Sequence, residues 1–283
     1  MNKLFHIFFF LLVFSTIGIA QTGVFNPKEL NNGNKGIVYD REAAGELKLF
    51  SNGFELGVNI GQLKTYYRTT YFHFGIGELK HNREFKNRDG IAGGSIGRSA
   101  RSYIFGKQNN LYTLRAGYGI KRYYSEKARK KGLAIGTSLE GGFTLGLLKP
   151  YFLEIRTTET GTASRVVVER FNGDNADAFL TPERINGAAP AINGLSEIEL
   201  RPGFHFNAGL HFDWGAFDEF VKAIEVGIAT DIFFGDIPIL IDEASFTNTS
   251  TATPPIVDIL PENVRNRPYF INFYIAFQFG KRW

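Results

Sequence analysis

Residues 271–283, INFYIAFQFGKRW, close the chain and decide its fold. In an extended conformation Ile271, Phe273, Ile275, Phe277 and Phe279 point to one side, and mostly polar or small residues point to the other. A strict period of two predicts a β-strand with one apolar face and one polar face. The fold depends on whether that apolar face meets a protein core or a lipid environment.

The same alternation recurs in seven earlier segments. These are residues 42–50, 54–61, 70–77, 112–121, 133–147, 198–214 and 224–232. A soluble β-sandwich also alternates, with its apolar face in the core. Here, however, the polar faces combine glycine and small residues with isolated charges, which suits the crowded interior of a small barrel. Strands of about 10 to 14 residues also match a tilted crossing of a bilayer. We therefore predict an all-β fold, an eight-stranded antiparallel up-and-down transmembrane β-barrel.

The spacing of the strands supports the barrel. Short connections are predicted at 64–68, 124–132 and 215–221, and long ones near 80–110, 149–194 and 235–267. Alternate connections of an up-and-down barrel lie at the same end, so the three long loops share one end. Only the hairpin at 51–53, SNG, is tight on that side. Outer-membrane barrels have this anatomy, with long extracellular loops and short periplasmic turns. The prediction is a barrel over 41–283 in the cell outer membrane, with both termini periplasmic.

The first twenty residues predict a cleaved signal peptide. Lys3 supplies the positive start, residues 4–14 the apolar run, and Gly18 and Ala20 the small residues before the cleavage site. The rival interpretation is a membrane anchor, but the apolar run is shorter than the ~20 residues that a spanning helix needs. Residues 21–40 then form an N-terminal periplasmic segment.

Composition excludes several classes of function. The formal net charge of +4 is too small to argue for a nucleic-acid partner. The chain has no cysteine, which excludes disulfides, cysteine nucleophiles and thiolate metal sites. No motif in the sequence predicts a cofactor.

With these features the sequence resembles the small eight-stranded outer-membrane β-barrels found widely in Bacteroidota-type bacteria. The most specific part of the resemblance is the last strand, where a terminal aromatic residue follows alternating apolar ones. The resemblance implies that the barrel-assembly machinery reads this signal. Its candidate residues are Phe273, Phe277, Phe279 and Trp283, with Gly280 interrupting the pattern. Members of the family include adhesin-like and structural barrels, components of secretion machines and lipid A-modifying enzymes.

Charged residues on the inward faces admit two interpretations. The set comprises Glu46, Lys48, Glu55, Arg115, Lys121, Glu140, Glu199, Arg201, His205, His211, Asp213, Glu225 and Asp231. Buried charges need partners and hydrogen bonds, so a salt-bridged, rigid interior is the first interpretation. A narrow polar path or an internal ligand site is the second.

Two basic clusters are candidate binding sites. The periplasmic turn at 121–131 carries a candidate partner-binding set, which is Lys121, Arg122, Lys127, Arg129, Lys130 and Lys131. The first long loop carries candidate contacts to lipopolysaccharide phosphates, which are Arg83, Lys86, Arg88, Arg98 and Arg101. Expected partners are therefore outer-membrane lipid and lipopolysaccharide, and a periplasmic or outer-membrane protein.

Catalytic signals are weak by comparison. His211 and Asp213 share a face, but the predicted topology places them at the inner end of their strand, away from outer-leaflet lipid A. His81 lies near the outer rim, without an evident nucleophile. His205 and His211 are about 20 Å apart along one strand, too far to share a metal ion. Two β-like runs, 151–156 and 165–171, predict a hairpin above the membrane.

The function we expect is a structural or binding scaffold, as a subunit of an envelope or secretion complex. The alternatives are a lipid A-modifying enzyme and a narrow channel.

Overall fold

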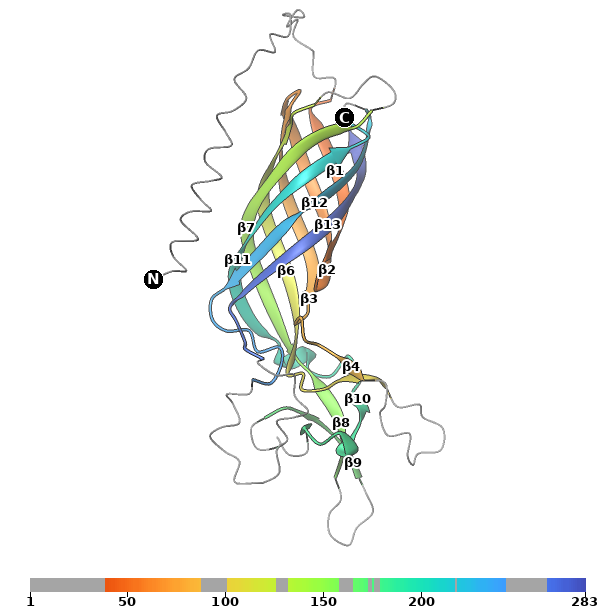
Figure 1. Cartoon of the computed structure of the whole chain (residues 1–283), viewed down its shortest axis with the longest axis vertical. Coiled ribbons are helices and arrows are strands. Elements are labelled where there is room, and N and C mark those ends of the chain that lie inside the picture. Colours follow the sequence, from red (N-terminus) through yellow and green to blue (C-terminus); the bar gives the residue numbers. More distant parts are fainter. Residues whose placement is uncertain are drawn as a thin grey trace, which may run out of the picture. The chain divides into compact units, whose positions relative to one another are not determined.

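A closed, all-β barrel dominates the computed structural model (Figure 1). The structure describes residues 39–87, 101–125, 132–157, 165–172, 175, 179–216, 218–242 and 264–283. The predicted signal peptide and most of the segment 21–40 lie outside these residues. Eight strands pair antiparallel in the closed order β1-β13-β12-β11-β7-β6-β3-β2. The predicted fold class is confirmed.

The barrel strands fall where the period of two placed them. Their bounds are β1 Arg41–Phe50, β2 Gly53–Thr65, β3 Arg68–Leu79, β6 Asn109–Tyr123, β7 Ala134–Pro150, β11 Glu199–Asp213, β12 Phe220–Phe233 and β13 Tyr269–Arg282. Each of these eight strands pairs with the barrel strand before it and the barrel strand after it along the chain, and β13 pairs with β1 to close the barrel. The three long connections therefore share one end of the barrel, here called the mouth, and the start of β1 and the end of β13 share the other.

Burial in this barrel is inverted relative to a soluble protein. Phe143 and Phe273 point outward and are 69% and 71% exposed, whereas the inward Glu55 and His73 are 0% exposed. Large apolar residues line the outer surface of all eight strands, from Leu47 on β1 to Phe279 on β13. The prediction that the apolar faces look outward and the charged faces inward is confirmed.

Above the mouth, the long connections form an ordered cap. The predicted hairpin is present as β8 (Phe152–Thr157) and β9 (Arg165–Arg170). A further strand, β10 (Ile185–Ala188), pairs with β8 and gives a three-stranded sheet in the order β10-β8-β9. β4 (Lys86–Asn87) and β5 (Tyr103–Ile104) form a second, two-stranded piece. Short 3-10 helices lie at Pro182–Arg184 and Leu195–Glu197, and no helix among the described residues is long and apolar enough to cross a membrane.

The cap has its own apolar core. Leu153 and Ile155 of β8 and Ile185 of β10 are buried together with Tyr103 and Phe179. These residues come from different long connections, so the cap packs as one unit rather than as separate loops.

Candidate functional site

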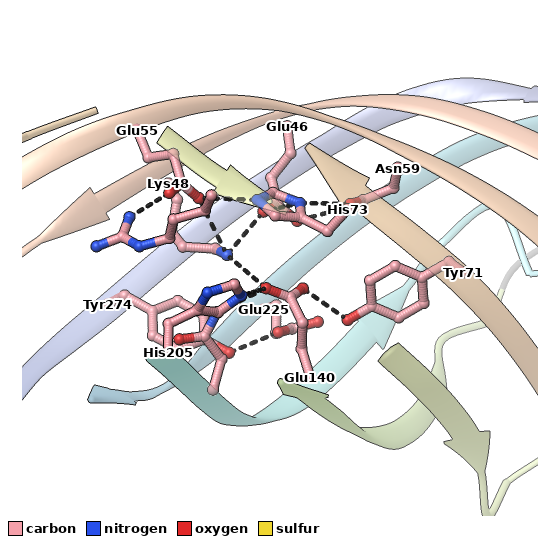
Figure 2. Close-up of polar contacts among 12 residues, drawn as sticks. Glu46, Lys48, Glu55, Asn59, Tyr71, His73, Glu140, His205, Glu225 and Tyr274 are labelled. Carbon is pink, nitrogen blue, oxygen red and sulfur yellow. Dashed lines mark hydrogen bonds and ion pairs between the residues drawn. The ribbon is translucent and has the colours of Figure 1, made fainter. Parts of the chain in front are cut away.

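The barrel interior is filled by a continuous network of polar side chains, part of which Figure 2 shows. The inward-facing charged and titratable residues are seven carboxylates (Glu42, Glu46, Glu55, Glu140, Asp213, Glu225, Asp231), four cations (Lys48, Arg115, Lys121, Arg282) and three histidines (His73, His205, His211). Each histidine ring lies against a carboxylate.

Lys48 of β1 is the hub of the middle layer. Its ammonium lies 3.0 Å from Glu46 and 3.3 Å from Glu55, and 3.9 Å from Glu140 on the opposite wall (Figure 2). Tyr71 donates to the second oxygen of Glu140 at 3.1 Å. One buried cation therefore lies within ion-pair distance of carboxylates from three strands and offsets part of their charge.

His73 of β3 fixes the wall beside this hub. Its Nδ1 lies 2.7 Å from Asn59 Oδ1, and its Nε2 lies 3.2 Å from Glu55 Oε1. Asn59 in turn donates to Glu46 Oε2 at 3.0 Å. The ligand atoms of Glu46, Glu55 and His73 lie within 4.8 Å of one another, close enough to consider a metal ion. Lys48 already supplies the positive charge there, so the donor set does not fit a metal cation.

Arg115 connects opposite walls of the barrel, on the mouth side of the layer around Lys48. From β6 it donates through Nε and Nη2 to Asp231 of β12, at 2.9 and 2.8 Å, and through Nη1 to Glu55 of β2. The planar guanidinium matches the carboxylate with two parallel hydrogen bonds, the strongest form of this pair.

Arg282 closes the opposite end of the barrel. It donates to Glu42 at 3.1 Å and to Asp213 at 2.8 Å, so the penultimate residue of the chain ties three strands together. Lys121 also reaches this layer, at 3.3 Å from Glu42 and 2.9 Å from Gln278.

An apolar layer lies at the mouth, above the polar network. Phe50, Leu79, Leu111, Leu148 and Phe233 turn inward at the strand ends and are buried. A segment after β12, residues 237–241 (IPILI), inserts between them and is here called the strap.

The strap joins the barrel to the cap. Ile237 and Ile239 pack in the apolar layer of the mouth, and Ile241 packs in the cap core. Backbone bonds hold the strap in place, from Gln108 to Ile239 at 2.9 Å and from Ile241 to Gly106 at 2.8 Å. The predicted long connection at 235–267 thus contains a stretch that is buried within the mouth, and its extracellular position stays a prediction.

A buried ion pair stabilises the cap over the strap. Lys107 lies 2.8 Å from Glu84, and both side chains are buried. Glu84 also accepts from the backbone N–H of His81 at 2.9 Å. Partial burial lowers the pKa of His81. Glu84 opposes that effect, while Arg83 and Arg267 reinforce it. The neutral ring can then accept the Arg83 N–H at Nδ1, 3.2 Å away.

Of the predicted partner-binding set, the structure describes Lys121 and Arg122, and these two residues lie in different environments. Lys121 is buried in the inner-end network and is not available to a partner, so its place in that set is wrong. Its inward position follows from the alternation of β6, which points Lys121 in and Arg122 out. Arg122 is exposed and lies over the ring of Tyr124. Lys127, Arg129, Lys130 and Lys131 lie outside the described residues.

The candidate lipopolysaccharide contacts are likewise divided. Arg83, Lys86 and Arg101 are exposed on the cap, as such a contact requires. Arg88 and Arg98 lie outside the described part of the chain. Binding itself stays a prediction.

Two residues of the predicted inward set do not enter the network. Glu199 and Arg201 pair with each other at 2.7 Å at the mouth end of β11, with side chains 59% and 31% exposed. The strand begins above the polar layers, so its first residues reach solvent before the interior starts.

His211 and Asp213, which the sequence suggested as an acid–base pair, bind other partners in the structure. His211 contacts Glu225 at 3.0 Å, whereas Asp213 binds Arg282 and Tyr123, both at the inner end. Both residues are fully buried. The pair that their spacing offered is thus not formed.

The predicted assembly residues share the outer surface of β13. Phe273, Phe279 and Trp283 are exposed and Phe277 is partly exposed. Gly280, which interrupts the aromatic pattern, faces β1, where a Cβ would lie 2.1 Å from the Ala43 carbonyl oxygen.

Comparisons with known proteins add little to this picture. No family model matches the chain, and no curated protein matches it either. Among solved structures, it is similar to the N-terminal β-barrel domain of Pseudomonas aeruginosa OprF, at 8% identity and a TM-score of 0.29. That match covers 85% of this chain and 97% of the other.

Proposed function

We propose that the protein is an integral β-barrel of the cell outer membrane, with the cap extracellular and the termini periplasmic. The inverted burial of the barrel carries this proposal. Soluble monomers rarely expose contiguous apolar patches beyond a few hundred Å², yet here apolar side chains cover the outer surface of all eight strands. Lipid is the environment that such a surface requires.

Within the membrane the protein acts as a scaffold rather than through its lumen. The supporting observation is that the interior charges are paired across the barrel and that an apolar layer and the strap cover them at the mouth. The surfaces left for recognition are the cap and the periplasmic turns. The exposed Arg122, together with the nearby Lys127, Arg129, Lys130 and Lys131 of the sequence, would dock an acidic periplasmic partner, as a subunit of an envelope or secretion complex would.

Co-purification from native outer membranes in mild detergent tests the proposal. A stoichiometric protein partner is expected, and neutralising Lys127, Arg129, Lys130 and Lys131 together should release it. A matched control neutralises Arg83, Lys86 and Arg101 of the cap and should leave the partner bound. A barrel that carries no partner in either form would contradict the scaffold function.

The same preparation addresses the two alternatives. A lipid A-modifying enzyme would alter the lipid A of the membranes in which it is made, and mass spectrometry of that lipid would reveal the change. A narrow channel would conduct in a planar bilayer. We expect unaltered lipid A and no stable single-channel steps; the second expectation rests on the ion pairs across the interior and on the apolar layer at the mouth.

A further inference from the structure

Within the described residues, strand β9 is an open edge of the cap sheet. In the order β10-β8-β9, the far side of β10 is covered, since Gly187 lies against the backbone of Arg101. β9 pairs with β8 on one side, and no other described strand pairs with it. Among the residues that the structure describes, its remaining backbone contact is the Arg170 carbonyl, which accepts from Asn175 Nδ2 at 2.8 Å. Residues 165–169 therefore present hydrogen-bonding groups that another strand can use.

The side chains of β9 add an apolar surface to this edge. Leu153 and Ile155 of β8 face the cap core, so the register places Val166 and Val168 on the opposite, outer face. These two valines are 45% and 44% exposed. Natural edge strands often carry charges or proline that discourage pairing. β9 has charges only towards its two ends, and between them lie three consecutive valines, β-branched residues that favour pairing.

The order of charges along β9 selects the partner. When a strand pairs antiparallel with its own copy around a two-fold axis through the sheet, a residue and its symmetry mate must point to the same face. In such a pairing one residue lies directly opposite its own copy, and this residue is the centre of the register. Centred on Val167, the pairing sets Arg165 opposite Glu169 and Val166 opposite Val168, twice each. Centred one residue earlier or later, it sets a charged side chain opposite a valine.

We propose that β9 is a self-association edge, at which a second copy of this chain binds antiparallel in the register centred on Val167. The two three-stranded sheets join into one sheet of six strands. Two Arg165–Glu169 pairs flank the Val167–Val167 contact, and the four outer valines form one apolar patch. Opposite charges and β-branched pairs directly across a sheet are both favourable.

The geometry also sets how the two molecules approach. β8 begins two residues after β7 ends and leads away from the barrel (Figure 1). Because the paired strands run in opposite directions, the two barrels would lie at opposite ends of the joined sheet. Such a contact suits copies in two facing membranes, and it can form freely between detergent micelles.

Disulfide trapping tests the register directly, because the natural chain has no cysteine. The variant is Val167→Cys in the purified full-length protein in detergent. Directly opposed residues have Cα atoms about 4.5–5.5 Å apart, within the range that a disulfide can bridge. Mild oxidation should give a covalent dimer. Val168→Cys is the matched control, since the proposed register separates the Cα atoms of the two copies at position 168 by about 8 Å, too far for a disulfide.

Charge exchange tests the partner preference without a cross-link. Arg165→Glu places like charges opposite each other twice and should weaken dimerisation roughly ten-fold, and Glu169→Arg should do the same. The double variant Arg165→Glu/Glu169→Arg restores both pairs and should recover the dimer, as measured by analytical ultracentrifugation in density-matched detergent.

Two results would overturn the inference. One is cross-linking of Val168→Cys as efficient as that of Val167→Cys, which would show random collision of exposed thiols. The other is a natural protein that stays monomeric at every concentration while the charge variants behave identically to it. Far-ultraviolet circular dichroism of each variant checks that the barrel is intact, so neither result can be blamed on misfolding.

Discussion

Arg115 on β6 and Asp231 on β12 bind each other through two hydrogen bonds, 2.9 and 2.8 Å long, although two strands separate them in the barrel wall. The side chains meet across the interior rather than along the wall. The same guanidinium also binds Glu55. This single residue therefore braces three sides of the barrel.

Replacing Arg115 should lower the free energy of unfolding of the barrel substantially. Arg115→Met leaves Asp231 buried without its cation and removes one of the two cations that contact Glu55, and breaking a buried pair in this way typically destabilises by about 3–5 kcal/mol. Urea unfolding in lipid vesicles measures the change. Arg122→Met is the control, because Arg122 lies on the same strand but is exposed, and its loss should change stability by less than about 0.5 kcal/mol. Equal effects of the two substitutions would show that the interior network contributes no more than a surface charge.

The strap should be needed to keep the cap closed. Ile239 is fully buried between the inward residues of the mouth, so Ile239→Ala removes apolar contacts and should destabilise the cap by about 2–5 kcal/mol. Limited proteolysis should then cleave the cap faster while the barrel stays resistant. Ile192→Ala, at a residue of the cap that is exposed, should leave the cleavage rate unchanged. Unchanged cleavage of the Ile239 variant would mean that the strap does not hold the cap.

Closure of the barrel should not tolerate a side chain at position 280. A Cβ there would lie 2.1 Å from the Ala43 carbonyl oxygen and 2.5 Å from Ala44 Cα, which forces β13 away from β1. Gly280→Val should reduce the fraction of folded barrel, measured as the heat-modifiable band on a denaturing gel. Gly45→Val is the control on the facing strand, where the nearest atom is 3.8 Å away. Normal folding of the Gly280 variant would contradict this account of the seam.

Acid should loosen the turn at His81. Its folded pKa lies below the ordinary value of 6.5, so the folded protein binds this proton less well than the unfolded chain does. The contact is therefore complete above pH 6.5 and is lost as the pH falls through the folded pKa. After correction for intrinsic rates, the Arg83 amide should exchange faster at about pH 5 than at about pH 7.5. His81→Asn keeps an acceptor that does not titrate and should remove this pH dependence, and its persistence would assign the effect to another group.

The period of two was sufficient to predict the faces of the strands. It placed Glu55, Arg115 and Asp231 inside and Phe143 and Phe273 outside, because alternation alone fixes the direction of a side chain in a strand. It could not predict which charges meet, since that depends on which walls face each other and how far each side chain reaches. Lys121 shows the limit most clearly. Its basic neighbours in sequence suggested a surface cluster, but the alternation of β6 points its side chain into the barrel.

The sequence also did not predict that the strap is buried in the mouth, and the reason is different. The strap contains Ile237, Ile239, Leu240 and Ile241, an apolar run too short and too interrupted by Pro238 to predict a strand. A run of aliphatic residues inside a long polar loop could have suggested burial. β10, with the sequence INGA, offers an even weaker signal and forms because β8 provides an edge to pair with.

The seam between β1 and β13 also affects how the protein can be made. Asp40 and Arg41 both donate their backbone N–H groups to the carbonyl of Trp283, which extends by one residue the pairing of β1 with β13 between Glu42↔Arg282 and Phe50↔Tyr274. A chain interrupted during synthesis or export would keep β1 and β12 as unpaired edges, however complete the rest of it is. A product truncated before β13 would therefore expose two strand edges that the closed barrel hides.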